Sequence, residues 1–152
     1  MNVLISACLL GVACRYDGAS RPLDTLPLDV KGIHFIPVCP EILGGLSTPR
    51  IPAERVDDRV LRQDGIDVTP EYRRGAEETL RLARLFACQY AVLKERSPSC
   101  GSGNIYDGSF GGVLKDGDGV TTELLKFHGI TVLGESDLPA FLQQFRGMKD
   151  DD

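Results

Sequence analysis

Four short apolar runs, each rich in β-forming residues, most constrain what this 152-residue chain can fold into. Runs that are apolar throughout, without alternating polar residues, are typical of parallel strands covered on both faces. Pro37 lies within the second run and predicts an edge strand or a strand end, because proline cannot donate a hydrogen bond to a neighbouring strand. The runs are NVLISA (2–7), HFIPV (34–38), YAVLK (90–94) and ITVL (130–133).

Segments with helical signals lie between and after these runs. Thr69-Pro70 is typical of an N-cap and first turn, and the helix-forming composition continues to about Cys88. A second helix is predicted over 120–128, with Gly129 as its C-terminal stop. Ser136 is a candidate cap for a last helix, whose apolar face is formed by Leu138, Phe141, Leu142 and Phe145.

The alternation of strands and helices predicts an α/β fold, a single three-layer domain with a mainly parallel, Rossmann-like sheet. The length of the chain suits one domain. We expect this domain to cover residues 1–146 and a flexible acidic tail to cover 147–152. Within segment 60–68, Asp64-Gly65 lies between two short apolar runs and predicts a small hairpin.

The charge balance argues against some partners. Seventeen basic and 22 acidic side chains give a net charge of −5, which argues against a nucleic-acid backbone but leaves a small base open. The apolar N-terminus is too short to span a bilayer and has no basic leader, so we expect a cytoplasmic protein without a membrane partner. The five cysteines are then reduced thiols or metal ligands. No feature specifies an oligomeric state.

Three cysteines follow the first three predicted strands. Cys8 follows the first, Cys39 follows the second, and Cys100 lies a short turn past the third. In an open parallel sheet, ligands bind beyond the carboxyl ends of the strands, so we expect these thiols to converge there. A single cysteine can equally be a small apolar core residue. Thiolate-only ligation favours an iron–sulfur cluster over zinc, which is usually held by four ligands that often include histidine.

The remaining cysteines and the histidines are weaker ligand candidates. Cys14 follows Cys8 in the same loop and stays open as a fourth ligand, whereas Cys88 lies on a helical segment and is assigned to the core. His34 lies within a strand and His128 at a helix end, where packing or capping is the commoner role.

Polar residues in the same loops are candidates for acid–base chemistry. Glu41 follows Cys39-Pro40 and is a candidate proton donor or base, although a loop glutamate is more often solvated. Ser97 and Ser99 can bind a substrate, activate water or only stabilise the turn. Four basic residues would offset the negative charge of a thiolate cluster: Arg15, Arg50, Lys94 and Arg96.

Taken together, these motifs resemble a known family. They are SACLLG with RYDG (6–18), PVCPEILGGLSTPRIPAE (37–54), LKERSPSCG (93–101), DGSF (107–110) and the late DGDGVTTELL segment. They are similar to the domain of unknown function whose characterised relatives are the thiouracil desulfidases. The similarity covers nearly the whole chain, from Val3 to about Leu138.

The resemblance implies a 4Fe-4S cluster held by Cys8, Cys39 and Cys100 with one iron open, which leaves Cys14 outside the ligand set. It also implies catalytic roles for Glu41 and Ser99, with Ser97 as a second candidate. The expected activity is the non-redox removal of sulfur from a thiolated nucleobase such as thiouracil.

Two alternatives to this activity stay open. The longer desulfidases carry a second C-terminal domain that this chain does not match, so a stand-alone domain can share the cluster and use a different substrate. The alternative from another class is a non-catalytic iron–sulfur or zinc-binding module for sensing or sulfur trafficking, or a purely structural domain. A cluster site without an open substrate pocket would favour such a module.

Overall fold

The computed structural model describes residues 1–24 and 30–148, and its centre is one parallel sheet. The strand order is β2-β1-β5-β8, with all neighbours parallel. All four apolar runs form strands as predicted, and β2 lies at an edge, where Pro37 is tolerated. The strands are β1 (Asn2–Ser6), β2 (His34–Val38), β5 (Tyr90–Leu93) and β8 (Thr131–Gly134).

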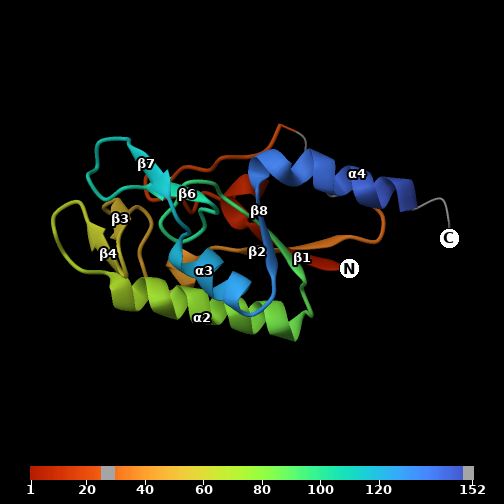
Figure 1. Ribbon diagram of the computed structural model, residues 1–152, viewed down its shortest axis with the longest axis horizontal. Coiled ribbons are helices and arrows are strands. Elements are labelled where there is room, and N and C mark those ends of the chain that lie inside the picture. The colour runs from red at the N-terminus through yellow and green to blue at the C-terminus, as the bar shows by residue number, and fades with distance from the viewer. Residues whose placement is uncertain (25–29, 149–152) are drawn as a thin grey trace.

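Helices cover both faces of this sheet: α2 (Thr69–Leu85), α3 (Val120–Phe127) and α4 (Leu138–Met148). Successive side chains of a strand point to opposite faces, so the central strands supply two cores. Leu4 and Leu93 pack in the core shared with α2 and α3, and Val3 and Val92 pack in the core shared with α4. Figure 1 shows α2 and α3 on one side of the sheet and α4 on the other. The predicted three-layer α/β fold is therefore confirmed.

Helix α2 begins where the sequence predicts, but a different residue caps it. The Thr69 hydroxyl accepts a hydrogen bond from the buried N–H of Val60 (2.8 Å). The carboxylate of Asp67 instead accepts from the Thr69 N–H (2.8 Å). Thr69 is thus the first helical residue and Val68 is the N-cap, which makes no side-chain capping hydrogen bond, while Asp67 one residue earlier accepts the first helical N–H. The helix ends at Leu85, and Cys88 beyond it is buried in the core, as expected.

The last helix is also present as predicted, but Ser136 does not have the expected capping role. Ser136 does not cap α4, because its N–H and hydroxyl both donate to the Glu95 carboxylate. The predicted apolar face is present, since Leu138, Phe141 and Leu142 are buried and Phe145 packs against them. The helix extends through Met148, and residues 149–152 of the expected tail lie outside the described residues, so the boundary at 146 stays a prediction. No helix in the described part of the chain is long and apolar enough to cross a membrane.

Two small hairpins lie beyond the carboxyl end of the sheet (Figure 1). The turn that the sequence predicts at Asp64-Gly65 is present, closed by hydrogen bonds from the N–H of Arg62 to the carbonyl of Ile66 (2.8 Å) and from the N–H of Val68 to the carbonyl of Val60 (2.9 Å). The strand before this turn also pairs upstream, which gives the first hairpin. The second hairpin was not predicted, because its strands are too short and polar to show an alternating pattern. The hairpins are β3 (Ala53–Val56) with β4 (Arg59–Arg62), and β6 (Asn104–Tyr106) with β7 (Leu114–Asp116).

Candidate functional site

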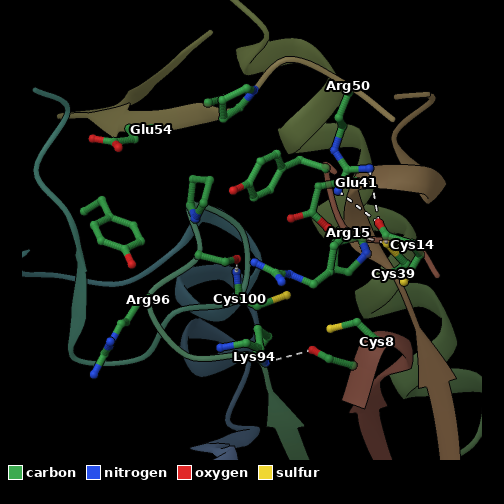
Figure 2. A pocket seen from close by; sticks show the side chains of 18 of the residues that line it. Cys8, Cys14, Arg15, Cys39, Glu41, Arg50, Glu54, Lys94, Arg96 and Cys100 are labelled. Carbon is green, nitrogen blue, oxygen red and sulfur yellow. Dashed lines mark hydrogen bonds between the residues drawn. The ribbon is translucent and has the colours of Figure 1, made fainter. Parts of the chain in front are cut away.

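The carboxyl ends of β1, β2 and β5 open into a pocket of about 560 Å³. Cys8, Cys39 and Cys100 all line this pocket, so the structure brings together the three cysteines that follow the predicted strands. Cys14 lines it as well, and Figure 2 shows the four cysteines around the same space. The pocket therefore gathers four thiols, one more than the ligand set that the family resemblance implies.

Local structure fixes each of the three strand-end cysteines differently. Cys8 lies in a short 3-10 helix, Ala7–Leu10, which starts directly after β1 and closes at Gly11 in the left-handed conformation (φ 97°). Cys39 precedes α1 (Pro40–Leu43), whose first turn carries Glu41. Cys8 and Cys39 are thus held within one turn of a strand end, whereas Cys100 lies further along the loop that follows β5.

The Cys100 turn rests on the start of α3. The carbonyl of Ser99 accepts a hydrogen bond from the N–H of Thr121 (2.9 Å), and the hydroxyl of Thr122 donates to the carbonyl of Cys100 (2.8 Å). A Cβ on Gly119 would lie 2.4 Å from the carbonyl carbon of Ser99, so only glycine permits this close approach.

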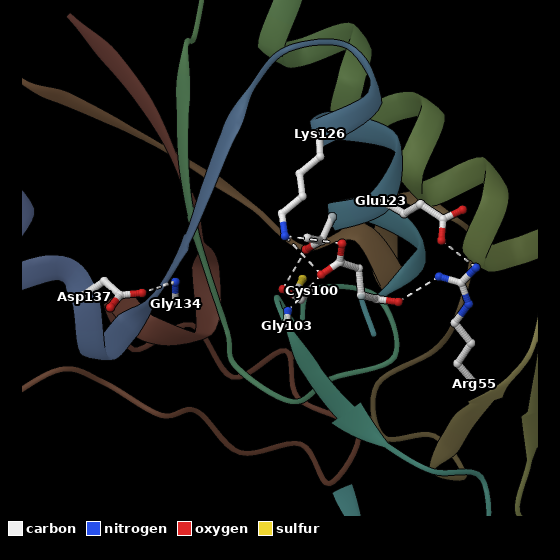
Figure 3. A network of polar contacts seen from close by, with 9 residues as sticks. Arg55, Cys100, Gly103, Glu123, Lys126, Gly134 and Asp137 are labelled. Carbon is white, nitrogen blue, oxygen red and sulfur yellow. Dashed lines mark hydrogen bonds and ion pairs between the residues drawn. The ribbon is translucent and has the colours of Figure 1, made fainter. Parts of the chain in front are cut away.

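Polar contacts hold both hairpins against α3 next to that turn (Figure 3). The guanidinium of Arg55 donates to the carbonyl of Asp118 (2.7 Å) and pairs with Glu123 (2.8 Å). The carboxylate of Asp118 accepts from the N–H of Gly103 (2.8 Å) and pairs with Lys126 (3.1 Å). The turn that carries Cys100 is therefore held in place before any ligand binds, as a pre-organised ligand site requires.

Burial keeps the thiols of Cys8, Cys39 and Cys100 protonated in the protein alone, because it raises the pKa of each. It raises the pKa of Cys8 to about 12, with further contributions from Cys14 and the charge of Glu41. Burial, followed by the charge of Glu41, also raises the pKa of Cys39 and of Cys100. Metal ligation requires thiolates, so a cationic centre must displace these protons when it binds.

The donor set fits an iron–sulfur cluster better than a single zinc ion. Neither histidine lines the pocket: His34 is exposed on β2, and the Nδ1 atom of His128 lies 3.0 Å from Arg84. Within residues 1–24 and 30–148, no three Cys, His, Asp or Glu side chains converge closely enough to hold one ion. Thiols spread around a larger space suit a multi-iron cluster, whose ligands bind at separate corners.

Glu41, Ser99 and Ser97 form a chain of hydrogen bonds beside the cysteines. The Ser99 hydroxyl donates to the carboxylate of Glu41, and these two side chains are only 1% and 9% exposed, respectively. A hydroxyl has one proton, so Ser97, 3.1 Å away, must donate to Ser99 in turn. Ser97 is free to do so because its oxygen accepts the backbone N–H of Cys100 (2.8 Å). The order of donation is therefore Ser97 to Ser99 to Glu41.

The same side chains also contact the thiols directly. One carboxylate oxygen of Glu41 lies 3.6 Å from the sulfur of Cys39, and the Ser99 oxygen lies 3.3 Å from the sulfur of Cys100. Glu41 and Ser97 therefore line the pocket, whereas Ser99 is buried behind its surface between them.

Basic side chains surround this space, as expected for a site with several thiolates. Arg15, Arg50, Lys94 and Arg96 all line the pocket. Both terminal nitrogens of Arg50 donate to the carbonyl of Cys14 (3.2 Å each), and Lys94 pairs with Glu135 (3.0 Å).

Sequence reasoning did not identify the residues of the opposite wall. Glu54, Tyr106 and Phe110 line the pocket there, and Tyr72 lines it from α2. Burial raises the pKa of Tyr72 above its ordinary value, so its hydroxyl stays neutral. Two quoted motifs end at residues of this wall, PVCPEILGGLSTPRIPAE at Glu54 and DGSF at Phe110, but neither residue was assigned a role.

Comparison with known proteins gives three matches. The family model described as 2-thiouracil desulfurase matches residues 3–137. YbbK of Bacillus subtilis (strain 168), described as an uncharacterized protein, is 40% identical over 146 residues, which cover 90% of this chain and 97% of YbbK. A solved structure of the 4Fe-4S-dependent thiouracil desulfidase TudS (DUF523Vcz) is 48% identical, with a TM-score of 0.87 over 91% of this chain and 93% of that one.

Proposed function

The chain belongs to the 2-thiouracil desulfurase family, and from that premise we propose that it is a 4Fe-4S-dependent desulfidase acting on a thiolated pyrimidine such as thiouracil. The observation that carries the proposal is one pocket that is lined by three strand-end cysteines, Glu41 and Ser97, with the buried Ser99 linking these last two side chains by hydrogen bonds. The pocket volume lies in the range of small-molecule sites. Such a space favours an enzyme over a sensing or trafficking module, which needs no substrate pocket.

Cys8, Cys39 and Cys100 would hold the cluster, and the surrounding basic side chains would offset its negative charge. When bound through three protein ligands, the cluster supplies a Lewis-acidic iron with a free coordination position for the thiocarbonyl sulfur. Cys14 is left as an unligated thiol beside it.

The side chains supply the proton transfers. Glu41 accepts a proton from the water that attacks the ring carbon, and it is held in place for this by the Ser99 hydroxyl. Ser97 orients Ser99 by donating a hydrogen bond to it, and the proton that Glu41 takes from the water is passed to the departing sulfide. In the net reaction, water supplies the carbonyl oxygen and the sulfur leaves as sulfide. No electrons are gained or lost, so the reaction needs no electron donor.

The free thiols and the net charge of the chain indicate the compartment and the kind of substrate. All five cysteines are free thiols, which suits the reducing cytoplasm. We expect a small thiolated base as the substrate, because the net charge of −5 disfavours a nucleic-acid chain.

Anaerobic turnover of 2-thiouracil tests the proposal. The protein is reconstituted with iron and sulfide, and sulfide release is followed without an added electron donor. Glu41→Gln nearly preserves shape but removes the proton acceptor, so we expect the cluster to assemble and the rate to fall by about a hundredfold or more.

The matched control is Glu77→Gln, the same chemical change at an exposed position of α2. It should turn over at the wild-type rate when both proteins have equal iron content. Equal rates for Glu41→Gln and wild type would remove Glu41 from the mechanism. A wild-type protein with a full cluster that releases no sulfide from any thiopyrimidine would overturn the proposed function.

A further inference from the structure

The wall of the pocket that faces away from the cysteines is built by the β6–β7 hairpin and β3. Tyr106 ends β6, and Phe110 and Gly112 lie in the loop that follows. Figure 2 shows Glu54 of β3 and Arg96 on this side, with Cys14 and Cys39 on the other. A substrate with its sulfur toward the cysteines therefore presents its ring to this wall.

Phe110 occupies a backbone conformation that ordinarily selects glycine. Its φ is +59°, in the left-handed region that side chains with a Cβ disfavour. Three glycines, at 108, 111 and 112, stand in the same loop, so glycine at position 110 would remove the strain. A residue that keeps a strained conformation points to a role for its side chain.

Core packing does not account for that role. Phe110 is only half-buried, and it belongs to none of the three apolar core clusters in the described part of the chain. It does line the pocket. The side chain is thus placed where a ligand, rather than the protein interior, would cover it.

Glu54 fixes the loop that carries Phe110. Its Oε1 atom accepts hydrogen bonds from the N–H groups of Gly108 and Phe110, both 3.0 Å long. At Gly108 the loop lies so close to β3 that a Cβ would fall 2.7 Å from a methyl carbon of Val56. One carboxylate therefore clamps two backbone groups, which pre-organises the loop before a ligand binds.

We infer that Phe110 is the residue on which the substrate ring stacks, and that Glu54 is the positioning residue that holds it there. The inference rests on the proposed function, because it assumes that the substrate is a thiolated base. It deepens that function by naming the residue that binds the ring of such a substrate, and it predicts a preference for cyclic thiocarbonyl compounds over acyclic ones such as thiourea. Stacking of a base on an aromatic side chain is a large part of base recognition wherever it occurs.

Steady-state kinetics on the reconstituted protein provide the first test. Phe110→Ala should raise the KM for 2-thiouracil about tenfold or more and leave kcat within about threefold, because stacking binds the ring without moving protons. Phe110→Tyr should restore the wild-type KM. Glu54→Ala should raise KM in the same way, and Glu54→Gln, which keeps an acceptor oxygen, should restore it. Iron content is matched in all five proteins.

A spectroscopic test does not depend on turnover. The chain contains no tryptophan, so Phe110→Trp introduces a single indole that can still stack and that is excited selectively, at wavelengths where the four tyrosines do not absorb. Titration of the reconstituted variant with uracil, the desulfurised product, should quench its emission saturably at constant cluster content. Phe127→Trp is the control, because Phe127 is 83% exposed on α3 and does not line the pocket. Its emission should not respond to uracil.

The outcomes separate the inference from the function on which it rests. If the wild type releases sulfide but Phe110→Ala keeps the wild-type KM, or uracil does not quench Phe110→Trp, stacking at Phe110 is wrong and the desulfidase stands. If the fully loaded wild type releases no sulfide, the desulfidase fails, and quenching at position 110 then shows whether a planar base still binds there.

Discussion

Cys14 has two structural roles that are separable at the scale of single residues. Its thiol lines the same pocket as the three strand-end cysteines, while its carbonyl accepts two hydrogen bonds from Arg50. The thiol of Cys39 also points toward that carbonyl, at 3.8 Å. The backbone of Cys14 thus ties the first loop to the loop after β2, and this contact does not depend on its sulfur.

Replacing single cysteines by serine tests which thiols hold the cluster. Cys14→Ser keeps the carbonyl contacts, so its iron content after reconstitution should stay near that of the wild type. Cys39→Ser removes a ligand and should lower iron content sharply. Cys88→Ser is the control, since Cys88 is buried in the core beneath α2. Loss of iron in Cys14→Ser would establish ligation by four cysteines, and a mechanism with an open iron would then fail.

At the scale of elements, the contact between α1 and α2 decides where Glu41 lies. Gly44 follows α1 and Gly75 lies within α2, and the two backbones touch at these glycines. A Cβ on Gly75 would lie 2.0 Å from the carbonyl oxygen of Pro40, the residue before Glu41. A glycine in a helix interior ordinarily weakens the helix, so here close packing must compensate.

Gly75→Ala should therefore destabilise the protein, although glycine-to-alanine changes in helices usually stabilise by about 1 kcal/mol. Overpacking costs about 1–3 kcal/mol and pushes α1 away, so we expect a net loss of stability and a lower rate of sulfide release. Urea unfolding measures the free-energy change. Glu77→Ala, an exposed change in the same helix, should alter stability by less than about 0.5 kcal/mol. A stabilised Gly75→Ala protein would show that the contact is not tight.

At the scale of the whole molecule, strand order brings the cysteines together. β1 lies between β2 and β5, so the three strands that lead to cysteines are neighbours, and β8, which leads to none, lies outside them. Any group bound by all three thiols therefore joins the loops after three strands. Binding to the folded state alone stabilises that state by mass action.

Cluster loading should consequently raise the thermal unfolding midpoint of the entire chain. We expect the reconstituted wild type to unfold about 5 °C or more above the iron-free protein, measured anaerobically by circular dichroism. Cys39→Ser should gain little from the same treatment, because it lacks one of the three ligands. Identical midpoints for the loaded and iron-free wild type would contradict a cluster that bridges the strand ends.

The positions of the elements could be read largely from the sequence, whereas their caps and the small hairpins could not. Continuous apolar runs can be recognised as strands because a strand that is buried on both faces needs an apolar residue at every position. The hydrogen bond from Ser136 to Glu95, by contrast, joins residues 41 positions apart, so it depends on which polar groups folding brings together. The strands of the hairpins are too short to show an alternation of apolar and polar residues. They are therefore defined by the strands with which they pair and not by local β-propensity.

The sequence by itself determined the sheet, its covering helices, and a cysteine placed just after each of three strands. Only the tertiary structure decided that Cys14 enters the same pocket, that Ser99 bonds Glu41 across 58 positions of chain, and that Glu54 holds Phe110. The reason is physical. Periodicity and propensity act within a few residues, so they fix elements. Contacts between loops depend on the order of the strands and on the packing of helices against both faces of the sheet. Side chains that are far apart in the sequence decide both.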